Sequence, residues 1–580
     1  MKTRELLVCA AAMAVLVFQV AAAGTGPCGG GDRPLAAVGT GPCVGGDRSL
    51  AAAGTGPGGG VSQAGVVVEP ESPDEKWWGA TTFFGGQQPY GTTPRRDLAV
   101  NNFFNPAAPL FVSSKGRYVW SDRPFAFAFT NGVLYVEGVG AEELEVKTAP
   151  EKTLRGAFRA AAAAHFPASG RMPEELFFAK PQFNTWVESK MVGNGEKMVS
   201  GYVDAILANR FPCGVFMIDE GWAPTNRYGD AAFNMDLFPH AKELFAKTRA
   251  KGFKTLLWTT PYVAQDCDFY RDGLKENLFV LNRETGKPAN LTYFPGLWTC
   301  GLLNLFDRVI WDRVEKHYKD FMADAGFDGY KFDFTDAFCV TQHTTKEKCR
   351  HLPDGKKPID YTGLWGDFAQ RFPFHELRAG WKYGGKPLVV RLQDKEHSWK
   401  DLRLLVPDMI SAGLVGCPFT CPDMIGGGTV AGGFDKGVDH KLFVRSAQVQ
   451  ALMPMMQFSA APWRLLTPDE LAICRDAANL HVAFAPEILR LARHAAKTGE
   501  PIVRAMEYEF PGEGLGECLQ QFMLGDRWLV APVVTPDDRV TVRLPRGAWR
   551  DDLGATHVGP KTLELKDVPL SRLPRFERGY

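Results

Sequence analysis

The run Gly329-Tyr330-Lys331-Phe332-Asp333-Phe334 carries two charged residues whose types and spacing could do chemistry. Lys331 and Asp333 are two positions apart, so on a β-strand both side chains lie on the same face. Where that face is a packed interior, an unpaired charge is costly. Two opposite charges at the end of a strand therefore indicate either a functional site or a buried structural ion pair.

Other apolar segments are also followed by side chains that could take part in catalysis. They are Asp219, Glu220 and Trp222; Trp258; Arg391 and Asp394; and Asp423. The C-terminal ends of barrel strands meet at one face, so these groups are expected to converge. Converging carboxylates with aromatic neighbours fit glycoside hydrolysis, which needs one ionised and one protonated carboxylate. Lys331 favours the ionised form of Asp333, as a nucleophile requires.

The segments between these groups predict the scaffold that positions them. From about residue 173 to residue 463, apolar strands alternate with amphipathic helices, such as 241–251 and 310–325, each of which leads into a glycine. Strand ends are expected at Trp186, Asp219, Tyr262, Asp333 and Arg391 and near Pro418 and Phe458. This pattern predicts a (β/α)8 TIM barrel. A doubly wound open sheet is the alternative, but the Gly-x-Gly-x-x-Gly turn is missing after the first strand.

Short apolar strands separated by turn residues flank the barrel region on both sides. The predicted fold is α/β, with the barrel between an N-terminal β-sandwich and a smaller C-terminal β-domain. Residues 65–170 form the sandwich, residues 171–498 form the barrel with its C-terminal helices, and residues 499–580 form the last domain. Thr467 and Glu470 form a capping box at the start of the last long helix.

The first residues have the composition of a secretory signal. Residues 1–23 combine a basic start, an apolar stretch and an Ala-x-Ala site, and an uncleaved anchor is the alternative reading. Residues 24–64 repeat Gly-Thr-Gly-Pro and predict a flexible low-complexity linker. We therefore expect the protein to enter the secretory pathway or leave the cell.

Composition narrows the range of partners. The 580 residues contain 66 Lys+Arg and 66 Asp+Glu, so there is no electrostatic case for nucleic acid or an anionic membrane. The 11 His form no H-x-H or H-E-x-x-H pattern, and the 12 Cys show no paired C-x-x-C spacing, so no metal is expected. Cys339 and Cys349 are the nearest couple for a disulfide.

Together, the motifs from about residue 170 to the C-terminus resemble glycoside hydrolase family 31, the retaining α-glycosidases. The matching motifs are Ile218-Asp219-Glu220, Phe332-Asp333, Arg391-Leu392-x-Asp394, Pro422-Asp423-Met424-Ile425-Gly426-Gly427, Arg445, Met456-Gln457-Phe458-Ser459 and Leu529-Val530-Ala531-Pro532-Val533. The resemblance implies that Asp333 is the nucleophile and Asp394 the general acid/base. It also implies sugar-binding roles for Asp219, Trp258, Lys331, Arg391, Asp423 and Arg445, with Glu220 and Trp222 as further candidates. Neither a metal nor an organic cofactor is implied.

The sequence departs from the family pattern beside the nucleophile. The α-glucosidases of the family usually read Trp-x-Asp-Met-Asn where this chain reads Lys331-Phe332-Asp333-Phe334-Thr335. Lys-x-Asp is typical of α-galactosidases in related barrel families, which also read Asp-Asp-Gly-Trp where this chain has Asp219-Glu220-Gly221-Trp222. A cationic Lys331 could donate to the axial hydroxyl that galactose carries at C4. The expected substrate is therefore a terminal α-galactoside on an oligosaccharide or glycoconjugate.

Three other functions remain open at this stage. The first is hydrolysis of an α-glucoside or another α-glycoside. The second is a glycan-binding or regulatory protein that keeps the fold without turnover, although both reacting carboxylates are present. The third is a barrel enzyme of another class, either a metal-dependent hydrolase or a lyase with Lys331 as a Schiff-base lysine.

Overall fold

The computed structural model describes residues 65–100, 102–224, 227–293, 298–336, 340, 344–430 and 433–579, with only the backbone for 290–293 and 298. The predicted signal peptide and linker therefore lie outside the described residues. Cys349 carries a free thiol, and Cys339, the partner considered for it, is also outside them.

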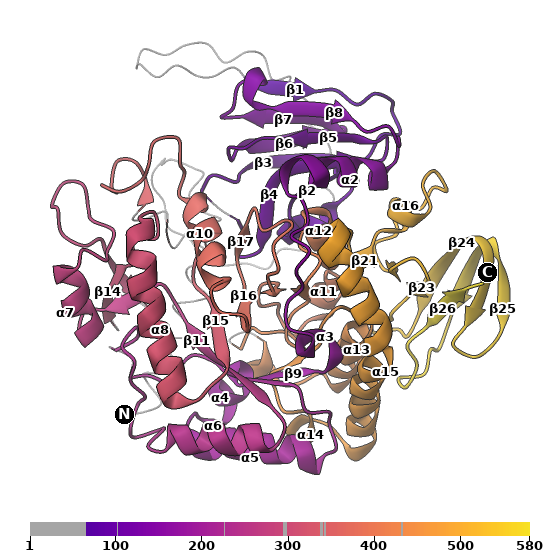
Figure 1. Ribbon diagram of the computed structural model, residues 1–580. Coiled ribbons are helices and arrows are strands. Elements are labelled where there is room, and N and C mark those ends of the chain that lie inside the picture. Colours follow the sequence, from indigo (N-terminus) through magenta and orange to yellow (C-terminus); the bar gives the residue numbers. More distant parts are fainter. Residues whose placement is uncertain are drawn as a thin grey trace, which may run out of the picture. The chain divides into compact units, whose positions relative to one another are not determined.

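Eight parallel strands form the predicted barrel in the middle of the described chain (Figure 1). In chain order they are β9 (Gln182–Asn184), β10 (Val215–Ile218), β11 (Lys254–Thr259), β15 (Gly329–Phe332), β16 (His375–Leu377), β18 (Val390–Arg391), β19 (Thr420–Cys421) and β20 (Gln457–Phe458). A parallel bridge between Met424 and Gln457, with the Ile425 N–H donating to the Gln457 carbonyl at 2.7 Å, nearly closes the barrel. The barrel prediction is thus confirmed and the open sheet is excluded.

Helices cover the outside of the barrel, and the two predicted over 241–251 and 310–325 are observed at 241–250 and 311–325. They include α5 (Glu196–Ala208), α6 (Ala241–Ala250), α8 (Trp311–Ala325), α10 (Ile359–Ala369), α12 (Leu405–Leu414), α13 (His440–Ala451) and α15 (Pro468–Thr498). Helix α8 ends at Gly326, whose φ of 84° is in the left-handed region that glycine adopts without strain. Thr467 and Glu470 form the expected capping box on α15.

Two sheets form the N-terminal domain. One contains β1 (Val66–Val68), β7 (Val133–Glu137), β6 (Ala126–Thr130) and β3 (Thr93–Asp97). The other contains β2 (Trp77–Thr81), β4 (Pro106–Ser113), β5 (Arg117–Trp120), β8 (Glu145–Thr148) and β17 (Gly380–Trp381). Strand β17 belongs to the barrel segment of the chain, so it ties the second sheet to the barrel. Helix α2 (Leu154–His165) packs on this sheet.

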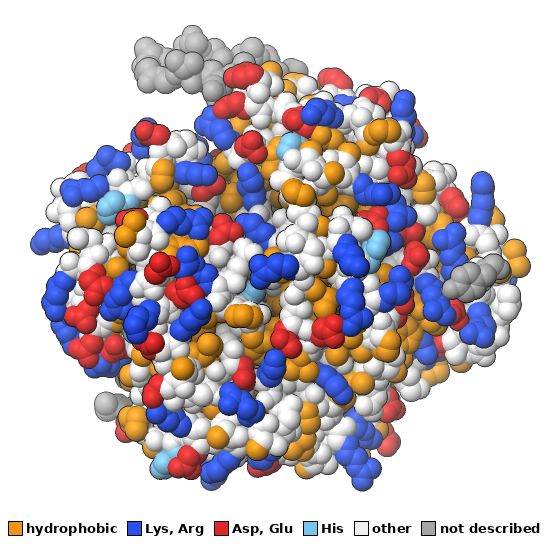
Figure 2. Space-filling view, in the orientation of Figure 1, with side chains coloured by type: hydrophobic (Ala, Val, Ile, Leu, Met, Phe, Trp, Pro, Cys, Tyr) orange, Lys and Arg blue, Asp and Glu red, His pale blue; other side chains and the backbone are white. Residues whose placement is uncertain are grey.

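The remaining strands form two further sheets. The C-terminal sheet has the order β21 (Val503–Arg504), β22 (Phe522–Leu524), β23 (Trp528–Val530), β26 (Arg575–Arg578), β24 (Val540–Asp551) and β25 (Thr556–Leu565). A small sheet of β12 (Tyr262–Ala264), β13 (Asn290–Tyr293) and β14 (Trp298–Leu302) follows β11. The sequence did not predict this insertion. On the face seen in Figure 2, basic and acidic side chains are intermingled, in keeping with the zero net charge.

Candidate active site

Neighbouring barrel strands bring the predicted charges together. Lys331 on β15 lies in register with Trp258 on β11 and with Glu376 on β16. Its Nζ donates to Asp219 Oδ2 after β10 at 2.7 Å, and both side chains are 2% exposed. The alternation that puts Lys331 and Asp333 on one face therefore directs both into the barrel mouth.

Asp333 is held by donors from three strand ends. Trp258 Nε1 donates to Oδ2 at 2.9 Å, while Arg378 Nε donates to Oδ1 at 2.9 Å. The Phe334 N–H also donates to Oδ1, at 2.7 Å, and Phe334 has a φ of +61°, a strained conformation for a bulky side chain. Burial acts to raise the pKa of Asp333, but the charges of Arg378 and Lys331 and these hydrogen bonds hold it well below its usual range.

Asp394 has a different environment. Its Oδ1 forms an ion pair with Arg391 Nη1 at 2.8 Å, and the same nitrogen donates to Asp423 Oδ1 at 2.7 Å. The Asp394 side chain is 31% exposed, compared with 7% for Asp333. Burial again acts to raise the pKa of Asp394, but the charges of Arg391, Arg378 and Lys331 leave it below the ordinary value.

The predicted residues divide into a buried group and an accessible group. Asp219, Trp258, Lys331, Asp333, Arg391 and Asp423 form the buried group. Asp394 and Glu220 form the accessible one. The Glu220 N–H donates to Asp219 Oδ1 at 2.8 Å, and its carboxylate lies 3.4 Å from Lys190 Nζ. Burial, partly offset by Lys190, raises the pKa of Glu220.

The structure does not bring Arg445 into this site. The Arg445 guanidinium donates to Asp538 at 2.8 Å and to the carbonyls of Val568 and Arg572 at 2.7 and 3.1 Å. Its predicted contact with the sugar is wrong, because this face of α13 packs against the C-terminal domain. Arg445 joins that domain to the barrel.

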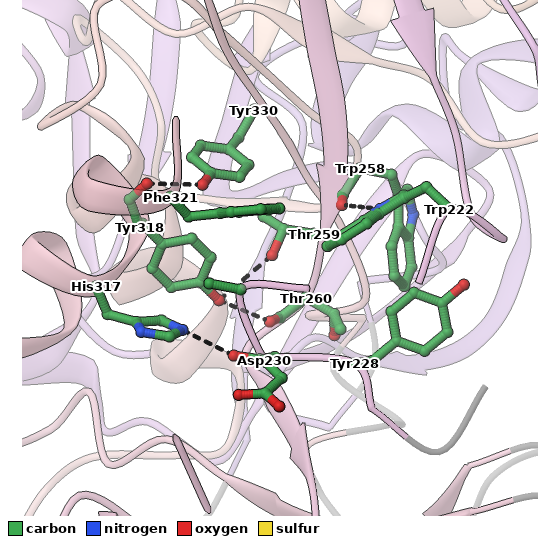
Figure 3. A pocket seen from close by; sticks show the side chains of 12 residues that line it. Trp222, Tyr228, Asp230, Trp258, Thr259, Thr260, His317, Tyr318, Phe321 and Tyr330 are labelled. Atoms are coloured by element: carbon green, nitrogen blue, oxygen red, sulfur yellow. Dashed lines mark hydrogen bonds between the residues drawn. The ribbon is translucent and has the colours of Figure 1, made fainter. Parts of the chain in front are cut away.

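Trp222 is the second correction. Its indole N–H donates to the Trp258 carbonyl at 2.9 Å, and its ring stacks on Phe321 of α8 (Figure 3). Together with Tyr318 and Thr260, it lines a cavity of about 20 Å³ behind the strands, which is large enough for a single water molecule. Trp222 thus supports the strand end that carries Trp258 and does not face the sugar site.

Sequence reasoning missed three residues beside the reacting carboxylates. Arg378 bridges Asp333 to Asp336, donating to the latter through Nη2 at 2.8 Å. Glu376 is fully buried between Lys331 and Arg391 and accepts a hydrogen bond from Gln457 at 2.9 Å. The spacing of Glu376 and Arg378 has the same period of two as Lys331 and Asp333, and this was the signal that could have revealed both.

The third missed residue is Trp186, directly after β9. Its Nε1 donates to the Gly428 carbonyl at 2.8 Å, so the loops after the first and seventh strands are connected across the mouth. A Cβ at Gly428 would lie 2.9 Å from both Cγ and Oδ1 of Asp394. A side chain at position 428 would therefore displace Asp394 from this position.

The described residues form neither a metal-binding cluster nor a membrane-spanning helix. No group of three or more His, Cys, Asp or Glu side chains is arranged to hold a metal ion. Nor is any described helix both long and apolar enough to cross a membrane.

Comparison with known proteins identifies the family. Residues 181–491 match the model of the glycosyl hydrolases family 31 TIM-barrel domain, and residues 499–579 match that of the family 31 C-terminal domain. The myogenesis-regulating glycosidase of Mus musculus is 30% identical over 402 residues, 67% of this chain and 55% of that protein. An α-xylosidase of Emericella nidulans is 23% identical over 487 residues, 78% of this chain and 57% of the relative.

Solved structures show the same fold. The family 31 dextranase FjDex31A of Flavobacterium johnsoniae, complexed with glucose, superposes with a TM-score of 0.74 at 19% identity, covering 87% of this chain and 65% of that one. This chain spans 55% and 57% of the length of the two curated relatives above. The matched barrel model alone covers more than half of the chain, and the chain belongs to glycoside hydrolase family 31.

Proposed function

We propose that this chain is a retaining, exo-acting α-glycosidase in which Asp333 is the nucleophile and Asp394 the general acid/base. The observation that carries the proposal is the contrast between the two carboxylates. Asp333 is buried and kept ionised by two cations, whereas Asp394 is accessible and shares its cation with a second acid. Retaining hydrolysis needs one carboxylate of each kind.

The hydrogen bonds suggest which oxygen of the nucleophile attacks. Oδ1 of Asp333 accepts from Arg378 and the Phe334 N–H, while Oδ2 accepts from Trp258. Oδ2, with fewer donors, would attack the anomeric carbon as Asp394 protonates the departing oxygen. The bond to the aglycone breaks, and a glycosyl ester of Asp333 forms. Water, deprotonated by Asp394, then cleaves the ester and releases the sugar with its α configuration retained.

The proposed substrate is a terminal α-galactoside. Among the described residues, Asp219 accepts the only hydrogen bond that Lys331 Nζ donates, so two of the three ammonium N–H groups remain for a sugar hydroxyl. Lys331 Nζ also lies 3.9 Å from Asp333 Oδ2, next to the position of the anomeric carbon. The relatives named above include proteins called an α-xylosidase and a dextranase. The sugar preference of this chain therefore depends on its own residues.

The test is release of p-nitrophenol from paired α-D-galactoside and α-D-glucoside substrates. We expect release from the galactoside and a loss of at least tenfold in kcat/KM for Lys331→Met, which keeps the length of the side chain. Lys190→Met is the matched control, because Lys190 pairs with Glu220 at the edge of the site. Release from the glucoside alone would overturn the substrate assignment and keep the activity. Binding of a glycan without release from either substrate would indicate a regulatory protein.

We also propose that residues 1–23 direct the chain into the secretory pathway. Their basic start and apolar stretch support this proposal, as does the Ala-x-Ala site before Gly24. N-terminal sequencing of the protein from eukaryotic culture medium should begin at Gly24. Recovery from membranes with Met1 retained would favour an anchor.

A further inference from the structure

Two carboxylates share one nitrogen of Arg391. Nη1 lies 2.8 Å from Asp394 Oδ1 and 2.7 Å from Asp423 Oδ1. The second oxygen of Asp423 accepts the Lys395 N–H at 2.8 Å, so both of its oxygens have protein donors. Arg391 and Asp423 are each 1% exposed, and only Asp394 is accessible. A single guanidinium thus faces two acids of different accessibility.

Among the described residues, no cation other than Arg391 lies within ion-pair distance of Asp394 or Asp423. Glu376 lies 3.8 Å from Arg391 Nε and adds a third carboxylate to the same guanidinium. Lys395 directs its ammonium away, to Asp408 at 2.6 Å. Three other charged groups face Asp394, and each has its own partner. Lys331 pairs with Asp219, while Arg378 pairs with both Asp333 and Asp336.

We propose that Asp423 is a positioning residue for the catalytic proton: Asp394 and Asp423 hold one proton in common across Arg391, which lets Asp394 act as an acid near neutral pH. This inference rests on the proposed glycosidase function. Two anions on one buried cation repel each other, so loss of the second proton is disfavoured. Burial, opposed by the charge of Arg391 and assisted by the charge of Asp394, raises the pKa of Asp423 to about 7.

The shared proton resolves an apparent conflict at the acid/base. The pKa of Asp394 lies below its ordinary value, which does not suit an acid at pH 7. As the pair titrates as a unit, the proton stays available after an isolated Asp394 would have lost it. A departing oxygen at the accessible carboxyl would draw that proton from the pair, and the incoming water would return it.

The experiment is the pH dependence of kcat/KM on a p-nitrophenyl glycoside, measured for the full chain. In the wild type, we expect the basic limb of the pH profile to lie near neutral pH. Asp423→Asn should shift the basic limb of kcat/KM by at least one pH unit toward acid pH. Asp423→Glu, which keeps the carboxylate, should restore the wild-type position of this limb. A wild-type limb below pH 5, or an unmoved limb in Asp423→Asn, would overturn the proposal.

Leaving-group dependence separates proton supply from simple damage. At pH 7, Asp423→Asn should lose at least tenfold more kcat/KM on a phenyl glycoside than on a 2,4-dinitrophenyl glycoside, which needs no acid. An equal loss on both would indicate a purely structural role. Asp408→Asn is the control, since it removes a buried carboxylate near Lys395 that makes no contact with Arg391. If Asp423→Asn does not fold, the proposal is tested by the same measurements on Asp423→Ser and by the position of the basic limb of kcat/KM in the wild type.

These outcomes separate the inference from the function on which it rests. An inactive wild type would contradict the proposed glycosidase. An active wild type in which the Asp423 variants leave the basic limb unmoved would contradict the shared proton alone.

Discussion

The two sides of the barrel mouth use the same residue type for opposite purposes. On the side of β11, β15 and β16, Asp333 accepts three hydrogen bonds and faces two cations. On the side of β18 and β19, Asp394 is accessible and competes with Asp423 for one guanidinium. The ratio of cations to carboxylates, more than the residue type, sets which acid is ionised and which can carry a proton.

The comparison also distinguishes how the two side chains are fixed. Asp333 is held by side chains from rigid strand ends. Asp394 lies on a loop in which the Asn105 side chain of the N-terminal domain accepts the neighbouring Gln393 N–H at 3.1 Å, and its carboxylate packs against Gly428, where a side chain would displace it. Each of the following changes acts on one side of the mouth.

The largest effect is expected from Asp333→Asn, which removes the nucleophile and keeps its shape. Turnover should fall by roughly three or more orders of magnitude, while the circular dichroism spectrum and Tm change little. Asp204→Asn on the exposed face of α5 is the matched control. Near-normal turnover in Asp333→Asn would contradict the assignment of Asp333 as the nucleophile.

Asp394→Ala should give the second-largest loss, and that loss should depend on the leaving group. We expect a fall of roughly 100-fold or more on phenyl glycosides and a much smaller fall on 2,4-dinitrophenyl glycosides. Added azide should restore turnover and yield an α-glycosyl azide, because the small anion needs no base. The absence of azide product would assign the acid/base to another residue.

Arg378→Gln tests how the nucleophile is kept ionised. Arg378 and Lys331 hold the pKa of Asp333 low against burial, so losing Arg378 raises that pKa toward the ordinary value. Activity needs ionised Asp333, so the acid limb of kcat/KM should move to higher pH. At pH 7, where Asp333 stays ionised, loss of the hydrogen bond that orients it should lower kcat/KM by roughly 10- to 100-fold. Arg371→Gln, at the end of α10, should leave the limb unchanged.

Gly428→Ala tests the fixed position of the acid/base. The new Cβ would meet Asp394 at 2.9 Å and the methyl group of Met424 at 2.4 Å, so something must shift. We expect kcat/KM to fall by about tenfold, with the larger share on substrates that need an acid. Gly201→Ala in α5, where a Cβ meets nothing within 4 Å, is the control. Equal activity in the two variants would mean that the loop can move freely.

The smallest effect on catalysis is expected from Arg445→Met, which lies outside both sides of the mouth. Its loss leaves the carbonyls of Val568 and Arg572 without this donor, while Asp538 keeps Lys441, and should lower the free energy of unfolding by roughly 2–4 kcal/mol, seen as a lower Tm. The kcat/KM should stay within about twofold of the wild-type value. A large loss of activity at an unchanged Tm would indicate that Arg445 takes part in sugar binding.

The sequence predicted the features that depend on local periodicity. Lys331, Asp333 and Trp258 could be placed at one mouth because strand alternation fixes their faces. Strand β16 is harder to recognise, because its three residues His375, Glu376 and Leu377 include no apolar run and only the period-two spacing of Glu376 and Arg378 points to it. Arg378 was missed with it, although it contacts the nucleophile directly.

The corrected residues show where local patterns fail. Arg445 matches a family motif, yet the direction of its side chain depends on how α13 packs against the C-terminal domain. Trp222 follows two site residues closely in sequence, but the turn at Gly221, with a φ of 103°, redirects the chain toward α8. Such directions depend on contacts between residues far apart in sequence, and a single sequence does not contain them.

The most direct test of the account is to trap the glycosyl ester and map it. The enzyme would be treated with 5-fluoro-α-D-galactosyl fluoride and, in parallel, with the glucosyl analogue, then digested and analysed by mass spectrometry. The account predicts one labelled peptide, with the sugar on Asp333, and no label in Asp333→Asn. A label on any other carboxylate would contradict it, as would steady hydrolysis of either fluoride without a trapped ester.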